Sequence, residues 1–408
     1  MNKPLVVILA GGSGKSFKPF VINKTLVPFA GKPLLQHVIE AVEQSGFRDA
    51  IVVTNSENES WLSTYQPFNI TIQTKIQNEP RGMADALMSI RNEIDSRPIL
   101  IMNAVDYIDP VFYKRIYQKT FSSEAFISGM KVDRYMPTGY LELADGRPRG
   151  IVEKPMKGTE PSEYINLVLH YFSDPNELLS TISGTTSHND DQYERALSSY
   201  MKSHGVDLLT YESYWQKLKY SFHVLDMMEL FLKHRLKKHR ATTAYVSPHA
   251  FVEGDVFIDE YARIDAFAVI KGPTYIGKSA RIGSHTLVRQ SMIEADSTIG
   301  FGSEIARSYI GPRCMLHHNF IGDSVLESDV NPSWGTTTAN LRLDKKEVRL
   351  KLPNGEYIET GKKKLGAVIA KGAFLGVNCS IMPGVAIEKD ASVKPNTVIN
   401  ETTPVKTS

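Results

Sequence analysis

The sequence predicts two domains of different architecture: an α/β, Rossmann-like domain over residues 1–222, and a left-handed parallel β-helix over residues 242–401. Three observations carry this prediction. Short apolar runs alternate with helical patterns in the first half, a glycine-rich turn follows the first of these runs, and an aliphatic residue recurs at every sixth position in the second half. At 408 residues the chain is long enough to bury two sizeable cores.

The composition argues against several classes of protein. Lys and Arg total 47 against 45 Asp and Glu, so no global charge favours nucleic acid or an anionic membrane surface as a partner. Cys314 and Cys379 are too few for a disulfide framework, which suits a reducing compartment. No apolar run approaches the roughly 18 residues of a membrane span. We therefore expect a cytoplasmic protein.

The chain opens with a strand and a turn that suit a polyanion. Leu5–Leu9 is short, apolar and rich in β-branched residues, as in a buried parallel strand. Glycines allow the following backbone to bend sharply and to bring its N–H groups against a phosphate. The turn consists of Gly11, Gly12, Ser13 and Gly14, and the lysines around it are Lys15, Lys18 and Lys24. These residues predict a site for a nucleoside triphosphate.

A P-loop is the competing interpretation of the sequence GSGKS at residues 12–16. That motif requires a glycine where this chain has Leu9, and its lysine should enter a helix that Pro19 would break. The spacing therefore disfavours a P-loop.

Further strand-like runs follow in the first half, and helical patterns separate them. The alternation favours a mostly parallel, doubly wound sheet with its site at the carboxyl ends of the strands. Asp106 follows one run directly, where a carboxylate can hold a divalent cation between phosphates, although a lone aspartate there is more often a cap or turn residue. The runs are Ala50–Val53, Ile70–Ile72, Ile99–Met102 and Ala125–Ile127.

The pattern LAGG-x-G-x-x-x-x-P, then Lys24, then L-x-P-x-x-G-K-P-L, resembles the signature of sugar-nucleotide pyrophosphorylases, the nucleotidyltransferases that act on sugar 1-phosphates. The resemblance implies that the glycine loop holds the triphosphate of UTP or dTTP. It also implies that Lys24 contacts the phosphates and that Asp106 binds Mg²⁺. The segment 77–86 is similar to the family's second motif, which implies that Gln77 and Gly82 recognise the nucleobase. Lys15, next to the loop, supplies positive charge.

Other segments resemble the family's sugar-binding side. They are 139–142, 151–155 and the strand that follows Asn166. The resemblance implies that the sugar 1-phosphate contacts Gly139, Glu153, Lys154 and Asn166. An exposed hairpin with surface ion pairs is the alternative interpretation of these segments.

The first half departs from the family's pattern at several positions. Ser16 replaces an arginine, Met83 a threonine and Val105 a glycine. Lys217 stands where relatives carry the second metal ligand, and an ammonium cannot ligate Mg²⁺. Either Lys217 substitutes electrostatically for a metal ion, or the nucleotidyl step is slow or absent.

A helical segment over residues 223–241 links the two predicted domains. Its apolar residues recur at helical spacing, and cations at its end match the helix dipole. The apolar residues are Leu225, Met228, Leu232 and Leu236, and the terminal cations are Lys237, Lys238, His239 and Arg240.

A six-residue repeat fills the second half. A period of six with one aliphatic residue per repeat is the hexapeptide pattern of a left-handed parallel β-helix, whose coils stack these side chains into one core. The repeat slips by one residue twice and is interrupted once. The positions are Val246, Val252, Ile258, Ile264, Ile270, Ile276, Ile282 and Val288, then Ile293, Ile299, Ile305, Ile310 and Leu316, and later Ile369, Leu375, Ile381, Ile387, Val393 and Ile399.

Residues 316–324 and 331–340 resemble the acetyltransferase half of bifunctional uridyltransferase/acetyltransferases that make UDP-N-acetylglucosamine, in their archaeal-like form. The resemblance implies that His317 deprotonates the amino group of a hexosamine 1-phosphate while acetyl-CoA supplies the acetyl group. It implies that the acceptor contacts Asn331, Asn340 and Lys346. It also implies a homotrimer.

Two departures keep alternatives open in this half. Phe320 replaces a tyrosine, and Trp334 replaces a small residue. His317 and His318 are alternatively a metal pair or plain surface residues. Three competing functions remain: an acetyltransferase with a degenerate nucleotidyl domain, a pyrophosphorylase whose β-helix only drives oligomerisation, and a non-catalytic regulatory subunit.

Overall fold

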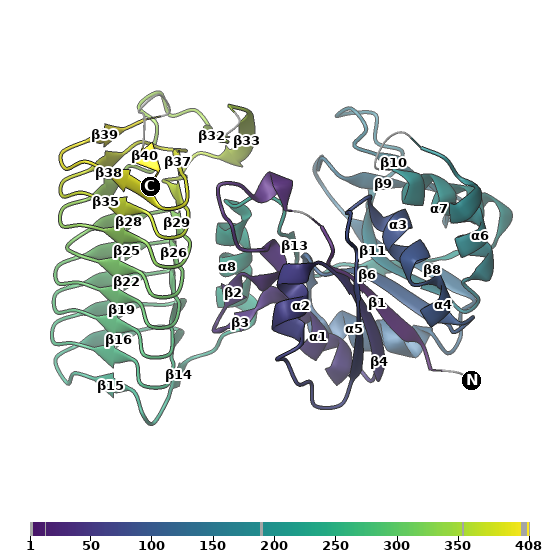
Figure 1. Ribbon diagram of the computed structural model, residues 1–408, viewed down its shortest axis with the longest axis horizontal. Helices are drawn as coiled ribbons and strands as arrows, with labels where there is room; N and C mark the ends of the chain where they lie inside the picture. Colours follow the sequence, from purple (N-terminus) through teal and green to yellow (C-terminus); the bar gives the residue numbers. More distant parts are fainter. Residues whose placement is uncertain (1–2, 13, 188–190, 353–354, 401–405, 408) are drawn as a thin grey trace. The chain divides into compact units, whose positions relative to one another are not determined.

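The computed structural model describes residues 3–12, 14–187, 191–352, 355–400 and 406–407 (Figure 1). The chain forms two compact units. The first consists of Met1–Ser13 and Leu35–Trp215, and the second of Gly14–Leu34 and Gln216–Ser408. This division does not follow the expected boundary at 222, because a segment near the N-terminus belongs to the unit that contains the β-helix.

The first unit is built on one mixed β-sheet with the strand order β10-β9-β11-β6-β1-β4-β5, to which β8 and β12 attach beside β11. β1 pairs in parallel with both β4 and β6, whereas β11 runs antiparallel to β6, β8 and β9. The alternation of strands and helices predicted a mostly parallel sheet, and this part of the sheet differs because β9 and β10 form a hairpin. The strands are β1 (Leu5–Leu9), β4 (Asp49–Thr54), β5 (Thr71–Ile76), β6 (Ile99–Asn103), β8 (Ala125–Lys131), β9 (Gly139–Ala144), β10 (Arg147–Glu153), β11 (Tyr164–Phe172) and β12 (Asp207–Tyr211), and the short β7 (Asp106–Ile108) follows β6.

Helices cover this sheet with their apolar faces. Alternate residues of β1 and β6 pack in one core cluster with residues of α3, α6 and α7, which is the arrangement expected of an α/β domain. α1 begins at Leu34, where the amphipathic pattern starts, and buries Leu35, Val38, Ile39 and Val42. The helices are α1 (Leu34–Gln44), α2 (Ser56–Leu62), α3 (Met83–Ser89), α4 (Arg91–Ile94), α5 (Pro110–Lys119), α6 (Asn176–Gly184) and α7 (Gln192–Ser203).

The second unit contains the predicted left-handed parallel β-helix, whose strands stack in successive coils (Figure 1). The strands form three faces, and each pairs in parallel with the strand one coil away. The first face holds β14 (His239–Arg240), β17 (Val256–Ile258), β20 (Thr274–Ile276), β23 (Met292–Ile293), β26 (Tyr309–Ile310), β29 (Val325–Leu326), β34 (Val368–Ile369) and β37 (Ala386–Ile387). The second holds β15 (Tyr245–Val246), β18 (Arg263–Ile264), β21 (Arg281–Ile282), β24 (Thr298–Ile299), β27 (Met315–Leu316), β30 (Asn331–Pro332), β35 (Phe374–Leu375) and β38 (Ala391–Val393), to which β40 (Lys406–Thr407) pairs antiparallel. The third holds β16 (Phe251–Glu253), β19 (Val269–Lys271), β22 (Leu287–Arg289), β25 (Glu304–Ala306), β28 (Phe320–Gly322), β31 (Thr337–Thr338), β36 (Ser380–Ile381) and β39 (Val398–Ile399).

The repeated aliphatic residues form the core of the β-helix, as predicted. The slips in the repeat are shortened coils: Ile264 pairs with Ile282, but Ile276 pairs with Ile293. The interruption is an insertion, because the chain leaves the coil after β31 and returns at β34. In between, β32 (Val348–Lys351) and β33 (Tyr357–Lys362) pair antiparallel.

The expected linker helix is shorter than its pattern suggested. α8 (His223–His234) ends before the basic residues, and residues 239–240 already form β14. Phe231 of α8 stacks on Phe29 at 5.2 Å, and Phe29 lies 5.8 Å from the ring of Tyr309. α8 and the segment Gly14–Leu34 therefore share aromatic packing with a face of the β-helix. In the part of the chain that the structure describes, no helix is both long and apolar enough to cross a bilayer.

Candidate functional site

The glycine loop follows β1 at the carboxyl edge of the sheet in the first unit. Ala10 donates its N–H to Val53 O at 2.7 Å, and Ala104 donates to Leu9 O at 3.1 Å, which continues both ladders of β1. A Cβ on Gly11 would lie 2.8 Å from Gln77 Oε1, so a side chain at residue 11 would displace the Gln77 amide from its present position. Gly12 has open space around it, and Ser13 lies outside the described residues.

Gln77 is held in a defined orientation next to this loop. Its backbone N–H donates to Thr54 O at 2.8 Å, and its side-chain Nε2 donates to Asp85 Oδ2 at 2.6 Å. Gly82 precedes α3 with φ of 95°, a conformation that favours glycine. The structure thus brings Gly11, Gln77 and Gly82 together. The sequence patterns did not identify Asp85 as the residue that holds Gln77.

Asp106 begins β7, directly after β6, at the same edge. Its Oδ2 accepts a hydrogen bond from Asn103 Nδ2 at 3.2 Å, while its Oδ1 is buried and has no hydrogen-bond partner among the described residues. Asp106 and Asn103 line a small pocket with Tyr113 and Trp215, whose indole Nε1 also has no partner in the described part of the chain. Buried polar atoms are almost always paired, so this oxygen points to a missing partner.

The side chains at this edge fit a magnesium ion held with substrate phosphates. Within the described ranges, no three His, Cys, Asp or Glu side chains gather to hold a metal by themselves. Mg²⁺ at such sites takes one or two carboxylates and completes its shell with phosphate oxygens and waters. A carboxylate with one unpartnered oxygen suits that role. Lys217 ends β13 (Trp215–Lys217), belongs to the second unit and offers no ligand.

The expected sugar-side residues of β9 and β10 lie together. Gly139 and Glu153 are paired across the hairpin, and a Cβ on Gly139 would lie 2.5 Å from Glu153 Oε1. Lys154 follows with φ of 47° and donates its N–H to Thr138 O at 3.2 Å. The Glu153 and Lys154 side chains are exposed.

Asn166 of β11 belongs to a chain of buried polar groups. Its Oδ1 lies 2.9 Å from His170 Nε2, and His170 Nδ1 lies 2.8 Å from the Tyr193 hydroxyl on α7. Burial lowers the pKa of His170 to about 3, so the ring is neutral at neutral pH. The sequence patterns missed both His170 and Tyr193, because no motif links a strand residue to a helix residue 23 positions away.

The lysines of the glycine-loop region lie on the segment Gly14–Leu34, within the second unit. Lys15 is exposed and starts a 3₁₀ turn, Lys15–Phe17, after Gly14. Lys24 starts a second turn, Lys24–Leu26, which Asn23 caps by accepting from Thr25 N at 3.0 Å. Ser16, which replaces the family's arginine, donates its hydroxyl to Lys219 O at 3.1 Å.

Two buried glutamates of the β-helix hold this segment. Glu327 accepts the N–H groups of Val21 at 3.2 Å and Ile22 at 2.9 Å, and Glu294 accepts the N–H of Gly31 at 3.0 Å. Burial raises the pKa of Glu294 to about 8. Each glutamate directly follows a core aliphatic residue of the first face. A glutamate directly after the core aliphatic residue of a repeat is the sequence pattern that would have identified them.

His317 lies at the corner between the second and third faces, after β27. Its side chain is exposed, and its backbone N–H donates to Asn319 Oδ1 at 2.5 Å. Asn319 in turn donates to Ser333 O at 2.9 Å. In the next coil Asn331 lies on the same face, and its Oδ1 is buried without a partner among the described residues. His317 and Asn331 therefore lie on adjacent coils, with Asn331 near the level of Met315 rather than directly beside His317.

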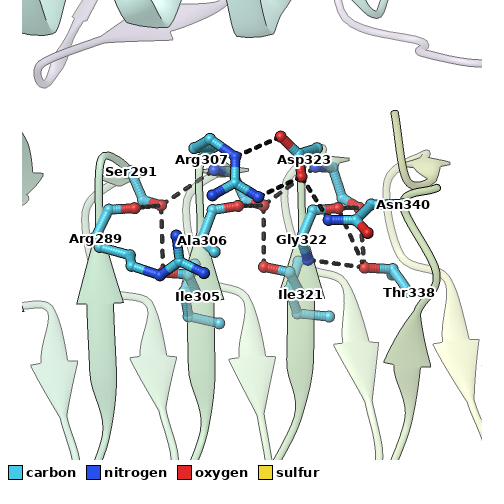
Figure 2. A network of polar contacts seen from close by, with 12 residues as sticks. Arg289, Ser291, Ile305, Ala306, Arg307, Ile321, Gly322, Asp323, Thr338 and Asn340 are labelled. Carbon is cyan, nitrogen blue, oxygen red and sulfur yellow. Dashed lines mark hydrogen bonds and ion pairs between the residues drawn. The ribbon is translucent and has the colours of Figure 1, made fainter. Parts of the chain in front are cut away.

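Asn340 lies at a different corner of the same chain, after β31 of the third face (Figure 2). Its Nδ2 donates to Asp323 Oδ2 at 2.6 Å, and Asp323 also accepts from Arg307 Nε and Nη2, each at 2.7 Å. Lys346 is exposed and lies before β32 in the insertion, where its N–H donates to Asp344. The residues predicted to share one acetyl site are thus not gathered at one corner of a single chain.

A ladder of rings occupies the corner that carries His317; its members are stacked except for His285 and Phe301, which meet edge to face. His318 stacks on Trp334 at 5.2 Å and lies 6.4 Å from the ring of Phe301. Trp334 therefore extends the ladder, with 56% of its surface exposed. The ladder consists of His249, Phe267, His285, Phe301, His318 and Trp334.

Comparisons with known proteins agree with this architecture. Residues 5–217 match the family described as nucleotidyl transferase. The chain is 30% identical over 399 residues to a bifunctional sugar-1-phosphate nucleotidylyltransferase/acetyltransferase of Sulfurisphaera tokodaii, covering 96% of each chain. It is 29% identical to the bifunctional protein GlmU of Methanococcus vannielii, covering 97% of this chain and 94% of that protein. A solved UDP-glucose pyrophosphorylase matches 57% of this chain and 99% of its own, with 17% identity and a TM-score of 0.51, which supports the fold of the first half.

The relatives of S. tokodaii and M. vannielii span both halves of the chain, in the same order as the two architectures described above. The family match covers the sheet, the glycine loop and Asp106. The chain therefore belongs to the nucleotidyl transferase family, in the group of bifunctional sugar-1-phosphate nucleotidylyltransferase/acetyltransferases.

Proposed function

We propose that the chain transfers a nucleotidyl group from UTP or dTTP to N-acetylglucosamine 1-phosphate or glucose 1-phosphate, and an acetyl group from acetyl-CoA to an amino-sugar 1-phosphate. The observation that carries the first activity is the arrangement at the carboxyl edge of the sheet. The close approach of Gly11 to Gln77 lies at the same edge as a buried Asp106 oxygen that has no partner among the described residues. Parallel α/β sheets bind their ligands at this edge.

In the nucleotidyl step, a phosphate oxygen of the sugar 1-phosphate attacks the α-phosphorus of the nucleotide, and the bond to pyrophosphate breaks. The N–H groups of the glycine loop and the charges of Lys15 and Lys24 stabilise the negative charge of the phosphates. Gln77 and Gly82 contact the nucleobase. Gly139, Glu153, Lys154 and Asn166 orient the sugar. When bound by Asp106, Mg²⁺ supplies charge neutralisation between the phosphates.

In the acetyl step, His317 accepts a proton from the amino group of the amino sugar. The nitrogen then attacks the thioester carbonyl, and the thiolate of coenzyme A leaves. The hydrogen bond from the His317 backbone to Asn319 fixes the turn that presents this imidazole. Asn331, Asn340 and Lys346 contact the acceptor.

The position of Asn340 supports a homotrimer as the working assembly. Since His317 and Asn340 lie at different corners of the β-helix, on adjacent coils, an acetyl site that uses both needs residues of two chains. Cyclic oligomers bring different corners of identical subunits together. The buried Cys314 and Cys379 are free thiols, which supports the cytoplasm as the location we propose.

Pyrophosphate release from UTP or dTTP with each sugar 1-phosphate and Mg²⁺ tests the first activity. We expect turnover that Asp106→Ala removes, with thiol release from acetyl-CoA and glucosamine 1-phosphate retained in that variant. Thiol release alone in the wild-type protein would favour an acetyltransferase with a degenerate nucleotidyl domain. Pyrophosphate release alone would favour a pyrophosphorylase whose β-helix only assembles the oligomer. No pyrophosphate release and no thiol release in the wild-type protein would favour a regulatory subunit.

A further inference from the structure

We propose that His170 and Tyr193 are positioning residues that fix the orientation of the Asn166 amide and thereby set the affinity for the sugar. This inference rests on the proposed function, because it takes Asn166 as a contact of the sugar 1-phosphate. Neither His170 nor Tyr193 belongs to a motif of the family that the sequence displays. Both lie behind Asn166, in the core of the first unit.

The orientation of the Asn166 amide sets the arrangement of protons. The neutral His170 ring carries one N–H, and the backbone of Leu167 is a further hydrogen-bond partner of the ring. With the amide oriented so that Asn166 Oδ1 lies 2.9 Å from Nε2, the N–H is on Nε2, because an amide oxygen only accepts. Nδ1 is then an acceptor, and the Tyr193 hydroxyl at 2.8 Å donates to it. Burial raises the pKa of Tyr193 well above its usual value, so this hydroxyl keeps its proton.

The consequence of this chain of bonds is a fixed amide. Donation from His170 holds Oδ1 of Asn166 toward the core, so Nδ2 is directed away from His170. No described residue accepts a hydrogen bond from this Nδ2. Asn166 therefore presents two N–H donors, which select an oxygen that accepts: a sugar hydroxyl or the carbonyl of an acetamido group.

The surroundings make the arrangement rigid. The rings of His170 and Tyr193 are parallel within 9°, with centroids 5.8 Å apart. The pairing of β11 with β8 also shifts register between Leu167 and His170. Such bulges redirect side chains and are frequent beside active sites. Tyr193 is fixed by packing of α7 in the core cluster of the sheet.

The test compares variants that keep the packing and remove the hydrogen bonds. His170→Phe keeps an aromatic ring against Tyr193 but cannot donate to Asn166. We expect KM for the sugar 1-phosphate to rise about three- to tenfold, the range of one neutral hydrogen bond, with kcat and KM for UTP within about twofold. His170→Gln, which restores an N–H near the Nε2 position, should recover most of the loss.

Tyr193→Phe provides a second, milder variant, because it removes only the hydroxyl. It should raise the same KM by less, and it should add nothing in the His170→Phe background, since both residues act through one amide. The matched control is His204→Phe, another histidine stacked on a tyrosine of α7, at 4.2 Å from Tyr200. This variant should leave KM for the sugar unchanged.

The two sugars identify the acceptor oxygen. A loss confined to N-acetylglucosamine 1-phosphate identifies the acetamido carbonyl, and an equal loss for glucose 1-phosphate identifies a hydroxyl. A sugar KM in His170→Phe equal to that of His204→Phe, or an equal rise in KM for UTP, would overturn the proposal.

Calorimetric titration with UDP-glucose and UDP-N-acetylglucosamine separates this proposal from the proposed function, because it needs no turnover. If the wild-type protein shows no turnover and His170→Phe weakens its binding of the nucleotide sugars, the positioning role is supported and the nucleotidyl activity is rejected. If the wild-type protein shows turnover and His170→Phe leaves the affinity unchanged, the nucleotidyl activity is supported and the positioning role is rejected. A wild-type protein that binds neither of these nucleotide sugars nor dTDP-glucose, and that shows no turnover, overturns both.

Discussion

Glu327 of the β-helix accepts a hydrogen bond from the backbone N–H of Ile22 at 2.9 Å, although the two residues are 305 positions apart in the sequence. The same carboxylate accepts from Val21 and Lys371. The segment that carries Lys15 and Lys24 is therefore attached to the β-helix by hydrogen bonds from its backbone N–H groups to the buried carboxylate of Glu327. Under the proposed function, the second half of the chain positions two lysines of the nucleotidyl step.

The first prediction concerns Glu327→Ala, which leaves three backbone N–H groups without their acceptor. Such hydrogen bonds to a charged group contribute about 1.5–3 kcal/mol each, so the segment should shift. We expect kcat/KM for nucleotidyl transfer to fall at least about tenfold, while thiol release from acetyl-CoA changes little. Glu260→Ala is the control, because this exposed carboxylate forms a surface ion pair with Lys278 of the adjacent coil. Equal nucleotidyl activity in the two variants would contradict the prediction.

The second prediction concerns the pH dependence of stability through Glu294. Burial raises its pKa to about 8 in the folded chain, above the value of an unfolded glutamate. The folded state therefore binds the proton more tightly, so the unfolded state loses it first as pH rises. Stability should fall between about pH 4.5 and 8, by an amount of the order of a few kcal/mol. Urea unfolding across this range measures it.

Glu294→Gln removes the titrating group and keeps an oxygen for the Gly31 N–H. In this variant the free energy of unfolding should depend much less on pH. It should also exceed that of the wild type by more at pH 9 than at pH 5. A parallel pH profile for the two proteins would show that Glu294 stays ionised when folded.

The third prediction concerns Gly11→Ala, whose new methyl group would lie 2.8 Å from Gln77 Oε1. Forcing an extra methyl into a packed site costs about 1–3 kcal/mol, so kcat/KM for UTP should fall about five- to hundredfold. Gly184→Ala is the control, because no atom lies within 4 Å of its added Cβ and it ends α6. Initial rates of pyrophosphate release measure both. An undiminished rate in Gly11→Ala would mean that the nucleotide binds elsewhere.

The fourth prediction concerns mixed oligomers of His317→Ala and Asn340→Ala. Each variant alone should lack acetyl transfer. Since the two residues lie at different corners of the coil, a site built across neighbouring chains can draw an intact His317 from one and an intact Asn340 from the other. Co-expression should restore up to about a quarter of the wild-type rate, because random assembly of a cyclic oligomer makes one such site in four. Thiol release measures the recovery, and none at all would place the site within one chain.

The β-helix was predictable because its information is local. One aliphatic residue every six positions gives a core, and even the shortened coils appear in the sequence as slips, as at Ile276 and Ile293. The strand and turn of the glycine loop were predictable for the same reason. β1 occupies Leu5–Leu9 as expected.

The contacts that the sequence did not reveal join distant positions. Glu294 and Gly31, or His170 and Tyr193, meet only because packing brings their elements together. The antiparallel position of β11 likewise depends on its pairing with β6 and β8, which lie well before it in the sequence. Asn340 shows what a resemblance to a family motif cannot predict. The motif predicts an asparagine at this position, but it does not predict at which corner of the β-helix the residue lies.

The attachment of residues 14–34 to the β-helix also limits which parts of the gene can be exchanged between relatives. A gene for two self-contained halves could be recombined at one point, near codon 222, and each half would remain compatible with a relative's partner. Here a short piece encoded near the start of the gene must match carboxylates encoded near its end, at Glu294 and Glu327. Functional chimaeras between relatives should therefore need three crossovers, near residues 14, 34 and 216, so that this piece is inherited with the second half.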